Sequence, residues 1–156
     1  MKTNEREALS SVFCTVLERL AFMFGEQAEK DEIPRSSAGY LAASISFIGP
    51  MRGTLSLTAP AAMCAQLAAN ILGLDESSAE ALEGGQDALK EVLNIVCGQL
   101  ITSIAGDSPV FDLTVPQVSA VNPAGWNALL AEEQTAAFLV DDVPVVLKLV
   151  ITEGAA

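Results

Sequence analysis

One apolar helix limits what this chain can fold into more than any other feature of the sequence. Residues 87–104 carry apolar side chains at intervals of three and four, the spacing that gathers them on one side of a helix. A side of this kind has to be buried against other elements, and Gly106 predicts the end of the helix. The apolar side consists of Leu89, Val92, Leu93, Val96, Leu100 and Ile104.

A polar line runs along the opposite side of the same helix. Asp87, Glu91, Asn94 and Gly98 follow one another at spacings of four, three and four, which stack side chains on one face. Asparagine is a modest helix former, and glycine inside a helix costs about 1 kcal/mol relative to alanine. The line has two interpretations: a solvated helix face, or a site where a partner approaches closely and an acid binds a cation beside an amide that orients a water.

Local signals predict the elements before this helix. Helical spacing covers residues 4–24, with Gly25 as the expected end, and residues 60–73, with a proline at the start and Gly73 at the end. Two β-rich runs flank residues 49–53 and predict a hairpin. Residues 74–85 form a polar joint that has room for a short helix.

The remainder of the chain has β patterns in residues 110–121, 134–142 and 143–151, the last two joined at Asp141 and Asp142 as a second hairpin. The order is helix, two strands, two helices, then three or four strands. It predicts an α+β fold with a mainly antiparallel sheet packed with long amphipathic helices, in a single domain over residues 1–156. An unpaired strand edge within residues 135–151 would be a place for dimerisation.

The two halves of the sequence also echo each other. Each half begins with an amphipathic helix and later offers a hairpin. In the first helix Glu18, Ala21 and Gly25 have the spacing of the later acid, asparagine and glycine. If the halves are duplicated, the first is a degenerate copy, because alanine stands where asparagine would.

Composition excludes several classes of function. The chain has 20 acidic and 8 basic residues and a net charge of −12, which disfavours nucleic-acid binding and anionic membrane surfaces. This acidity favours solubility, or a partner with a basic face. The sequence has no histidine, so it holds no histidine triad, histidine base or histidine-containing metal site.

Cysteine use and hydropathy suggest a location. Cys14, Cys64 and Cys97 are widely spaced and form no CxxC pair, a pattern typical of reduced thiols, and we interpret Cys97 as structural. We find no signal peptide and no apolar run of 18 residues free of polar breaks, so we expect a cytoplasmic protein without membrane insertion. Trp126 is interpreted as a partly buried loop aromatic, or alternatively as an interface anchor.

The helix and its surroundings resemble a known family. The stretch DALKEVLNIVCG is similar to the signature helix of the CheC/CheX/FliY phosphatases, which has an acid or serine, then Glu, then Asn, and a proline some twenty residues on. The matching positions here are Asp87, Glu91, Asn94 and Pro116. The stretch FIGPMRGTLSLTAPAAMCAQLAANILG resembles the family's hairpin and following helix, so the resemblance covers roughly residues 45–121. With one intact Glu-xx-Asn copy, the chain looks closest to the CheX members.

The resemblance implies a function. The family hydrolyses the aspartyl phosphate of a phosphorylated CheY-like response regulator, which carries its own Mg²⁺, so we expect no metal ligands and no cofactor in this chain. It implies that Asn94 positions the attacking water and that Glu91 pairs with a lysine of the regulator. Asp87, Gly98 and Pro116 would serve docking, with Pro116 shaping the backbone at a strand start. It also implies a homodimer.

Two other interpretations stay open from the sequence. The chain is alternatively a non-catalytic module of the same fold that binds a receiver domain or a second copy. A third interpretation, an acidic structural dimer without a receiver partner, leaves the polar line unexplained. Asn94 separates the first two, because a pure binding module has no need of an amide that orients water.

Overall fold

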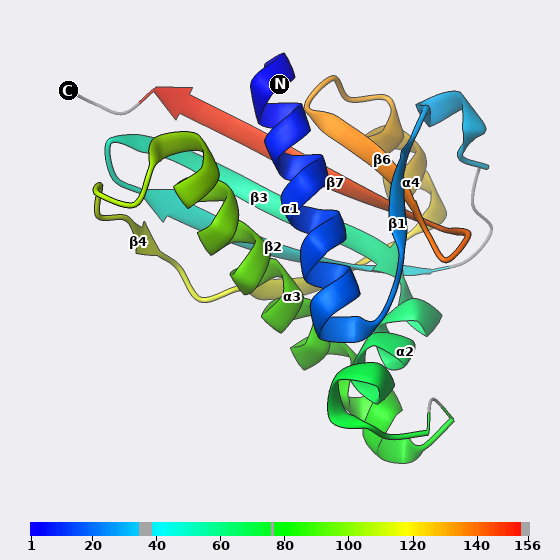
Figure 1. The fold of residues 1–156 in the computed structure, drawn as a ribbon. Helices are drawn as coiled ribbons and strands as arrows, with labels where there is room; N and C mark the ends of the chain where they lie inside the picture. Colours follow the sequence, from blue (N-terminus) through cyan, green and yellow to red (C-terminus); the bar gives the residue numbers. More distant parts are fainter. Residues whose placement is uncertain (35–38, 76, 154–156) are drawn as a thin grey trace.

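A layer of helices covers one face of an antiparallel sheet (Figure 1). This computed structural model describes residues 1–34, 39–75 and 77–153. Helices α1 and α3 lie side by side across the sheet, with α2 beside the first turns of α3, and α4 lies on the opposite face. The helix bounds are α1 Thr3–Ala21, α2 Ala61–Leu72, α3 Ala79–Ala105 and α4 Pro123–Leu130.

The sheet confirms the predicted α+β class. Its order is β1-β6-β7-β3-β2-β4, with β5 also paired to β2, and every pairing is antiparallel. A short 3-10 turn, Lys30–Glu32, follows the first strand. The strand bounds are β1 Gly25–Ala28, β2 Tyr40–Ile48, β3 Met51–Pro60, β4 Asp112–Leu113, β5 Gln117–Val121, β6 Thr135–Val140 and β7 Val143–Glu153.

The strand order is symmetric about the central β7–β3 pair. The first half of the chain supplies α1, β1 and the β2–β3 hairpin, and the second supplies α3, β4 with β5, and the β6–β7 hairpin. The short strand β1 pairs with β6, whereas β4 and β5 pair with β2. Each half therefore adds its short strand to the hairpin of the other half, and the predicted duplication is visible in the topology.

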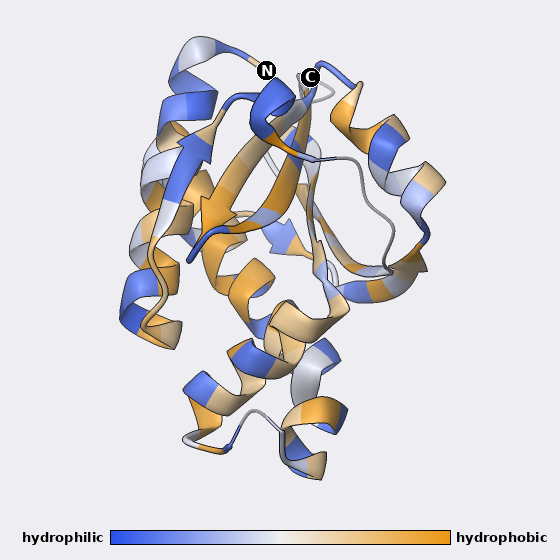
Figure 2. Cartoon of the chain, turned by 90° about the vertical axis from the view of Figure 1, so that its right-hand side faces the viewer, coloured by the Kyte–Doolittle hydropathy of each residue, from blue (hydrophilic) through white to orange (hydrophobic). Residues whose placement is uncertain are grey.

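The main core lies between the sheet and the helical layer. Alternate residues of the hairpin strands, such as Ile45, Leu55 and Leu147, are buried against the helices. Phe13 of α1 meets Phe138 of β6 edge to face, with ring centroids 5.0 Å apart. Figure 2 shows apolar colouring over much of the strands and mixed colouring along the helices. This pattern is the one expected for amphipathic helices on an apolar sheet face.

The long helix α3 begins earlier than the sequence predicted. Ser78 caps it by accepting a hydrogen bond from the backbone N–H of Ala81 at 3.1 Å, so most of the supposed polar joint is helical. The sequence analysis allowed only a short helix in this joint, whereas its residues from Ala79 onward belong to α3 itself. A Cβ on Gly85 would lie 3.2–3.3 Å from backbone atoms of Cys64 and Ala65, so Gly85 lets α2 approach closely. The predicted end at Gly106 is confirmed.

The first helix ends earlier than predicted. α1 stops at Ala21 because Phe22 adopts a left-handed backbone conformation, with φ of 56°. Gly25, predicted as the helix end, is instead the first residue of β1, a strand that the sequence analysis missed. The helix over residues 60–73 is confirmed as α2, with Pro60 at its N-cap and Gly73 at its C-cap.

Trp126 is not a partly buried loop residue, as we had expected. It belongs to α4, is completely buried, and stacks on Tyr40 with ring centroids 4.0 Å apart. The two rings lie in a second, smaller apolar cluster on the face of the sheet away from α1 and α3. A side chain buried in this way cannot serve as the interface anchor that we considered.

The β patterns of the second half also need correction. The run over residues 110–121 forms two short strands, β4 and β5, with a break before Pro116. The strands β6 and β7 are both interior, so the unpaired edge expected within residues 135–151 does not exist. The edges of the described sheet are β1 on one side and β4 with β5 on the other.

By length and composition alone, α3 is apolar enough to cross a membrane. Ten of its residues are nevertheless buried inside this fold. Most of these buried residues belong to the core beneath the helical layer.

Candidate functional site

The predicted polar line lies on the outer face of α3. Asp87, Glu91 and Asn94 are exposed and Gly98 is partly exposed, whereas the apolar side predicted opposite them is buried except at its last residue, Ile104, which is half-buried. The interpretation that the line faces away from the core is therefore confirmed. Regular helix geometry over the whole stretch fixes these four residues relative to one another, since α3 runs unbroken from before the line to beyond it.

The polar side chains of the line have no partners within the described part of the chain. Neither Glu91 nor Asn94 takes part in a side-chain hydrogen bond, and neither Asp87 nor Glu91 forms an ion pair with another described residue. A carboxylate and a carboxamide thus lie free, about one helical turn apart. The carboxylate can bind a cation, and the amide can both donate to and accept from a single water.

Gly98 has open space beside it. A Cβ at this position would meet nothing within 4 Å, in contrast to the crowded Gly85. Packing within the fold therefore gives no reason for glycine here, although glycine inside a helix is destabilising. Thr102, one turn on, donates a hydrogen bond of 3.1 Å to the Gly98 carbonyl oxygen. The backbone at Gly98 is left accessible to another molecule.

Pro116 does not lie on the line. It immediately precedes β5, the strand that pairs with β2 and contacts α3, and it is half-buried. The segment before it folds back toward α3, where Phe111 and Leu113 help to line a hollow beside Gly98. The observed position at the start of a strand matches the predicted one, while a docking role for Pro116 has no structural contact to support it.

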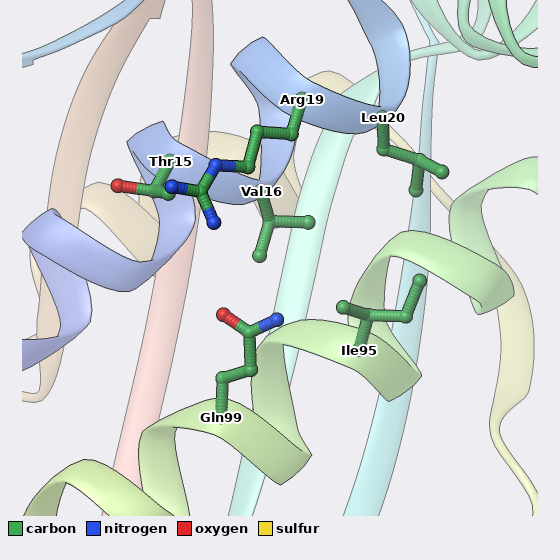
Figure 3. A pocket seen from close by; sticks show the side chains of 6 residues that line it. All are labelled: Thr15, Val16, Arg19, Leu20, Ile95 and Gln99. Atoms are coloured by element: carbon green, nitrogen blue, oxygen red, sulfur yellow. The ribbon is translucent and has the colours of Figure 1, made fainter.

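A second hollow flanks the line on its other side, and the sequence analysis did not foresee it. It lies between α1 and α3 and has a volume of roughly 200 Å³ (Figure 3). No signal in the sequence identifies it, because helical periodicity does not reveal which helices will be neighbours. Its lining residues are Thr15, Val16, Arg19 and Leu20 of α1 with Ile95 and Gln99 of α3.

The thiols near the site are unsuited to nucleophilic chemistry. Burial raises the pKa of the Cys97 thiol to about 11 and that of Cys64 to about 12. Both side chains are buried, and a nucleophilic cysteine needs an accessible thiolate. Cys97 is therefore a core residue of α3, as interpreted from the sequence.

Among the residues that the structure describes, no three or more His, Cys, Asp or Glu side chains cluster in a way that could hold a metal ion. The chemistry available on the line is that of an exposed carboxylate and an exposed amide. The carboxylate can pair with a cation, and the amide can order a water.

Comparison with known families supports the resemblance found in the sequence. Residues 41–135 match the family described as chemotaxis phosphatase CheX. This region includes α3 with the complete polar line and Pro116. No curated protein sequence matches the chain.

Solved structures of CheX proteins share the fold. The chain superposes on chemotaxis protein CheX from Desulfovibrio desulfuricans with a TM-score of 0.69 at 13% identity, covering 95% of this chain and 99% of that one. For CheX from Vibrio vulnificus the TM-score is 0.66 at 19% identity, covering 95% and 99%. For the CheX-CheY-BeF3-Mg²⁺ complex from Borrelia burgdorferi it is 0.64 at 16% identity, covering 95% and 97%.

Proposed function

The chain belongs to the CheX family of chemotaxis phosphatases, and from this membership we propose that it hydrolyses the aspartyl phosphate of a phosphorylated CheY-like response regulator. The observation that carries the proposal is the pair of exposed side chains, Glu91 and Asn94, on the outer face of α3, which have no partner among the described residues. The Borrelia burgdorferi complex, in which a CheX of the same fold is bound to CheY with BeF3 and Mg²⁺, supports this class of partner.

In the proposed mechanism the enzyme mainly positions a water. An acyl phosphate is already reactive, so a water held in line with the phosphorus is sufficient for hydrolysis. The Asn94 amide accepts a hydrogen bond from this water or donates one to it and so fixes its direction of attack. Glu91 pairs with a lysine of the regulator and sets the register of the two proteins, while Asp87 adds a second carboxylate to the docking face.

Gly98 has a steric role in this proposal. Because nothing within the fold crowds it, its lack of a side chain benefits only a partner that approaches the helix backbone. The Mg²⁺ belongs to the regulator, as the family resemblance implies, and this chain brings no cofactor of its own. We place the reaction in the cytoplasm, where free thiols such as those of the three cysteines persist.

The test is the rate of phosphate loss from a phosphorylated receiver domain. Wild type should accelerate it, and Asn94→Ala should lower the turnover rate by roughly 100-fold, the scale expected when a reacting group is misplaced. Binding of Asn94→Ala to the receiver with beryllofluoride, a phosphoryl analogue, and Mg²⁺ should be retained. Glu91→Ala should weaken both binding and turnover.

A pair of glycine variants tests the close approach. Gly98→Ala should stabilise the protein by up to about 1 kcal/mol, since it removes a helix glycine into open space, and should nevertheless reduce phosphatase activity. The matched control is Gly84→Ala, whose Cβ would make an ordinary contact of 3.5 Å with Ala68. It should leave activity unchanged. Equal activity of both variants would remove Gly98 from the site.

The alternative of a non-catalytic module is decided in the same assay. If wild type binds receivers with beryllofluoride but does not accelerate phosphate loss, the chain is a receiver-binding module of the CheX fold. If it neither binds nor accelerates, the polar line is a solvated helix face.

We also propose a homodimer, as the family resemblance implies. Exposed apolar side chains lie at and beside the sheet edge formed by β4, and pairing of this edge with a second copy would cover its open backbone groups and the side chains next to it. These residues are Ile48, Val110, Leu113 and Val115. Light scattering should give twice the chain mass for wild type and a smaller mass for Val115→Asp; a wild-type monomer would contradict the proposal.

A further inference from the structure

The hollow between α1 and α3 has an apolar floor and a polar rim. Val16 and Leu20 of α1 and Ile95 of α3 supply the apolar surface, and Figure 3 shows Arg19 and Gln99 extending toward each other over Val16. An apolar depression bordered by a few polar groups is the usual form of a binding subsite on a protein surface. Its volume of roughly 200 Å³ suits a side chain rather than a large ligand.

Arg19 places a cation, unpaired among the described residues, beside the hollow. The chain is strongly acidic, yet the Arg19 guanidinium forms no ion pair and no hydrogen bond with another residue of the described chain. Its place in the last turn of α1 favours a cation through the helix dipole. However, the side chain lies back toward Thr15, over the hollow, and not toward the C-terminal carbonyl groups. Its donors are therefore directed at whatever enters the hollow.

The hollow adjoins the polar line. Ile95 and Gln99 each directly follow a residue of the line, Asn94 and Gly98, on the same helix. A partner that contacts Glu91 and Asn94 and approaches Gly98 closely would also extend over the α1 wall, the side of the hollow that α1 forms. Its contact surface would then include the hollow.

We infer that this hollow is a docking subsite for the response regulator, in which one apolar side chain of the regulator seats on Val16, Leu20 and Ile95 while Arg19 pairs with a carboxylate beside it. The inference rests on the proposed function and deepens it. Arginine can hold a carboxylate through two parallel hydrogen bonds, which fixes orientation as well as attraction. In this arrangement α1 selects the regulator, and α3 acts on its phosphoryl group.

The experiment measures steady-state phosphate release while the concentration of phosphorylated regulator is varied. Arg19→Gln should raise KM by roughly threefold to tenfold with little change in kcat, as expected for loss of an interfacial charge pair. Arg19→Lys should recover part of the loss. The matched control is Arg52→Gln, which removes an exposed cation on β3, on the face of the sheet away from α1 and α3, and should change neither constant.

A second variant tests the apolar part of the subsite. Thr15→Trp adds a large side chain at the rim of the hollow and should raise KM further, while thermal unfolding reports whether the fold is intact. The KM of wild type should also rise more steeply with salt than that of Arg19→Gln, because one screened charge pair is missing in the variant.

The outcomes separate this inference from the proposed function. If wild type is active and Arg19→Gln and Thr15→Trp both match it in KM, the subsite is overturned while the phosphatase remains. If wild type is inactive, affinity for the receiver with beryllofluoride and Mg²⁺ replaces KM as the readout. Weaker binding by Arg19→Gln than by Arg52→Gln would then support the subsite, and equal or absent binding would overturn it.

Discussion

The helices α1 and α3 occupy equivalent places in the two halves of the sheet, yet only α3 exposes both the acid and the asparagine of the proposed motif. On α3 both Glu91 and Asn94 are exposed. On α1 the matching acid, Glu18, is exposed as well, but Ala21, at the position of the asparagine, is completely buried. The two helices therefore share the spacing of the motif, but the second position of the motif is buried on α1 and exposed on α3.

The difference comes from where each helix ends. α3 continues to Ala105, well beyond Asn94, whereas α1 stops at Ala21 and the chain turns into the core at Met23. The Ala21 carbonyl oxygen accepts a hydrogen bond of 2.8 Å from the Asn70 side chain of α2. With its helix end buried and capped, the α1 copy exposes the acid but has no accessible position for an amide.

The strongest test of this comparison moves the asparagine. In the double variant Asn94→Ala with Ala21→Asn, activity should stay roughly 100-fold below wild type, because an amide at position 21 is buried and cannot reach a substrate. Ala21→Asn alone should lower the free energy of unfolding by about 1–3 kcal/mol, the cost of burying an unsatisfied amide. Phosphate release and urea unfolding check the two parts. Restored activity would show that α1 retains a usable second site.

The next test concerns the contact that allows α3 to start early. Gly85→Ala should lower the free energy of unfolding by about 1–3 kcal/mol, since the added methyl group presses on the α2 backbone. Gly84→Ala, its neighbour, should leave stability equal or higher by up to about 1 kcal/mol. Chemical unfolding of both variants provides the comparison, and similar values for the two would mean that α2 and α3 separate easily.

A smaller effect is expected at the end of α1. Asn70→Ala removes the hydrogen bond to the Ala21 carbonyl oxygen and should cost about 1 kcal/mol of stability. Gln66→Ala changes an exposed polar residue of α2, the helix that also holds Asn70. Its free energy of unfolding should stay within about 0.5 kcal/mol of wild type. If the two variants are equally stable, the cap contributes nothing to holding α1 in place.

The smallest expected difference between α1 and α3 is in the reactivity of their cysteines. Cys14 of α1 is half-buried and Cys97 of α3 is fully buried, and burial raises the pKa of both thiols. At pH 8 a thiol reagent should label Cys14 first, and Cys14→Ser should abolish only this fast phase. Equal labelling rates for Cys14 and Cys97 in the wild type would contradict the assignment.

The burial of Cys97 also makes the stability of the fold depend on pH. An unfolded cysteine ionises near pH 8.5, whereas folded Cys97 has a pKa of about 11. The unfolded state therefore loses this proton first, so the contribution of Cys97 to stability should be constant below about pH 8 and fall as the pH rises from there toward 11. Thermal unfolding at pH 7, 9 and 10 measures the decline.

Elements with local signals were predicted well. Pro60 and Gly73 mark the ends of α2, and apolar spacing identified the buried side of α3. Asn122 followed by a proline was a signal that we did not use: its side chain accepts a hydrogen bond of 2.7 Å from the backbone N–H of Gly125 and begins α4. That signal would also have placed Trp126 on a helix.

Elements decided by distant partners were not predictable. The four residues of β1 have no β pattern and become a strand by pairing with β6, more than a hundred residues away. For the candidate site, spacing placed Asp87, Glu91, Asn94 and Gly98 on one face because a helix fixes that relation by itself. The α1 wall beside them depends on tertiary packing, which no periodicity reports.

The exchange of short strands between the halves has a consequence during synthesis. The central pair joins β3 to β7, so the middle of the sheet cannot close until the last strand has left the ribosome. Until then α1 and the β2–β3 hairpin have emerged without their final neighbours, and the apolar edge of β3 is open to wrong pairing. Folding governed by such distant contacts is slow compared with that of a helical bundle. A ribosome that stalls before residue 143 would therefore release a chain that holds the complete polar line of α3 but lacks the strand that joins its two halves.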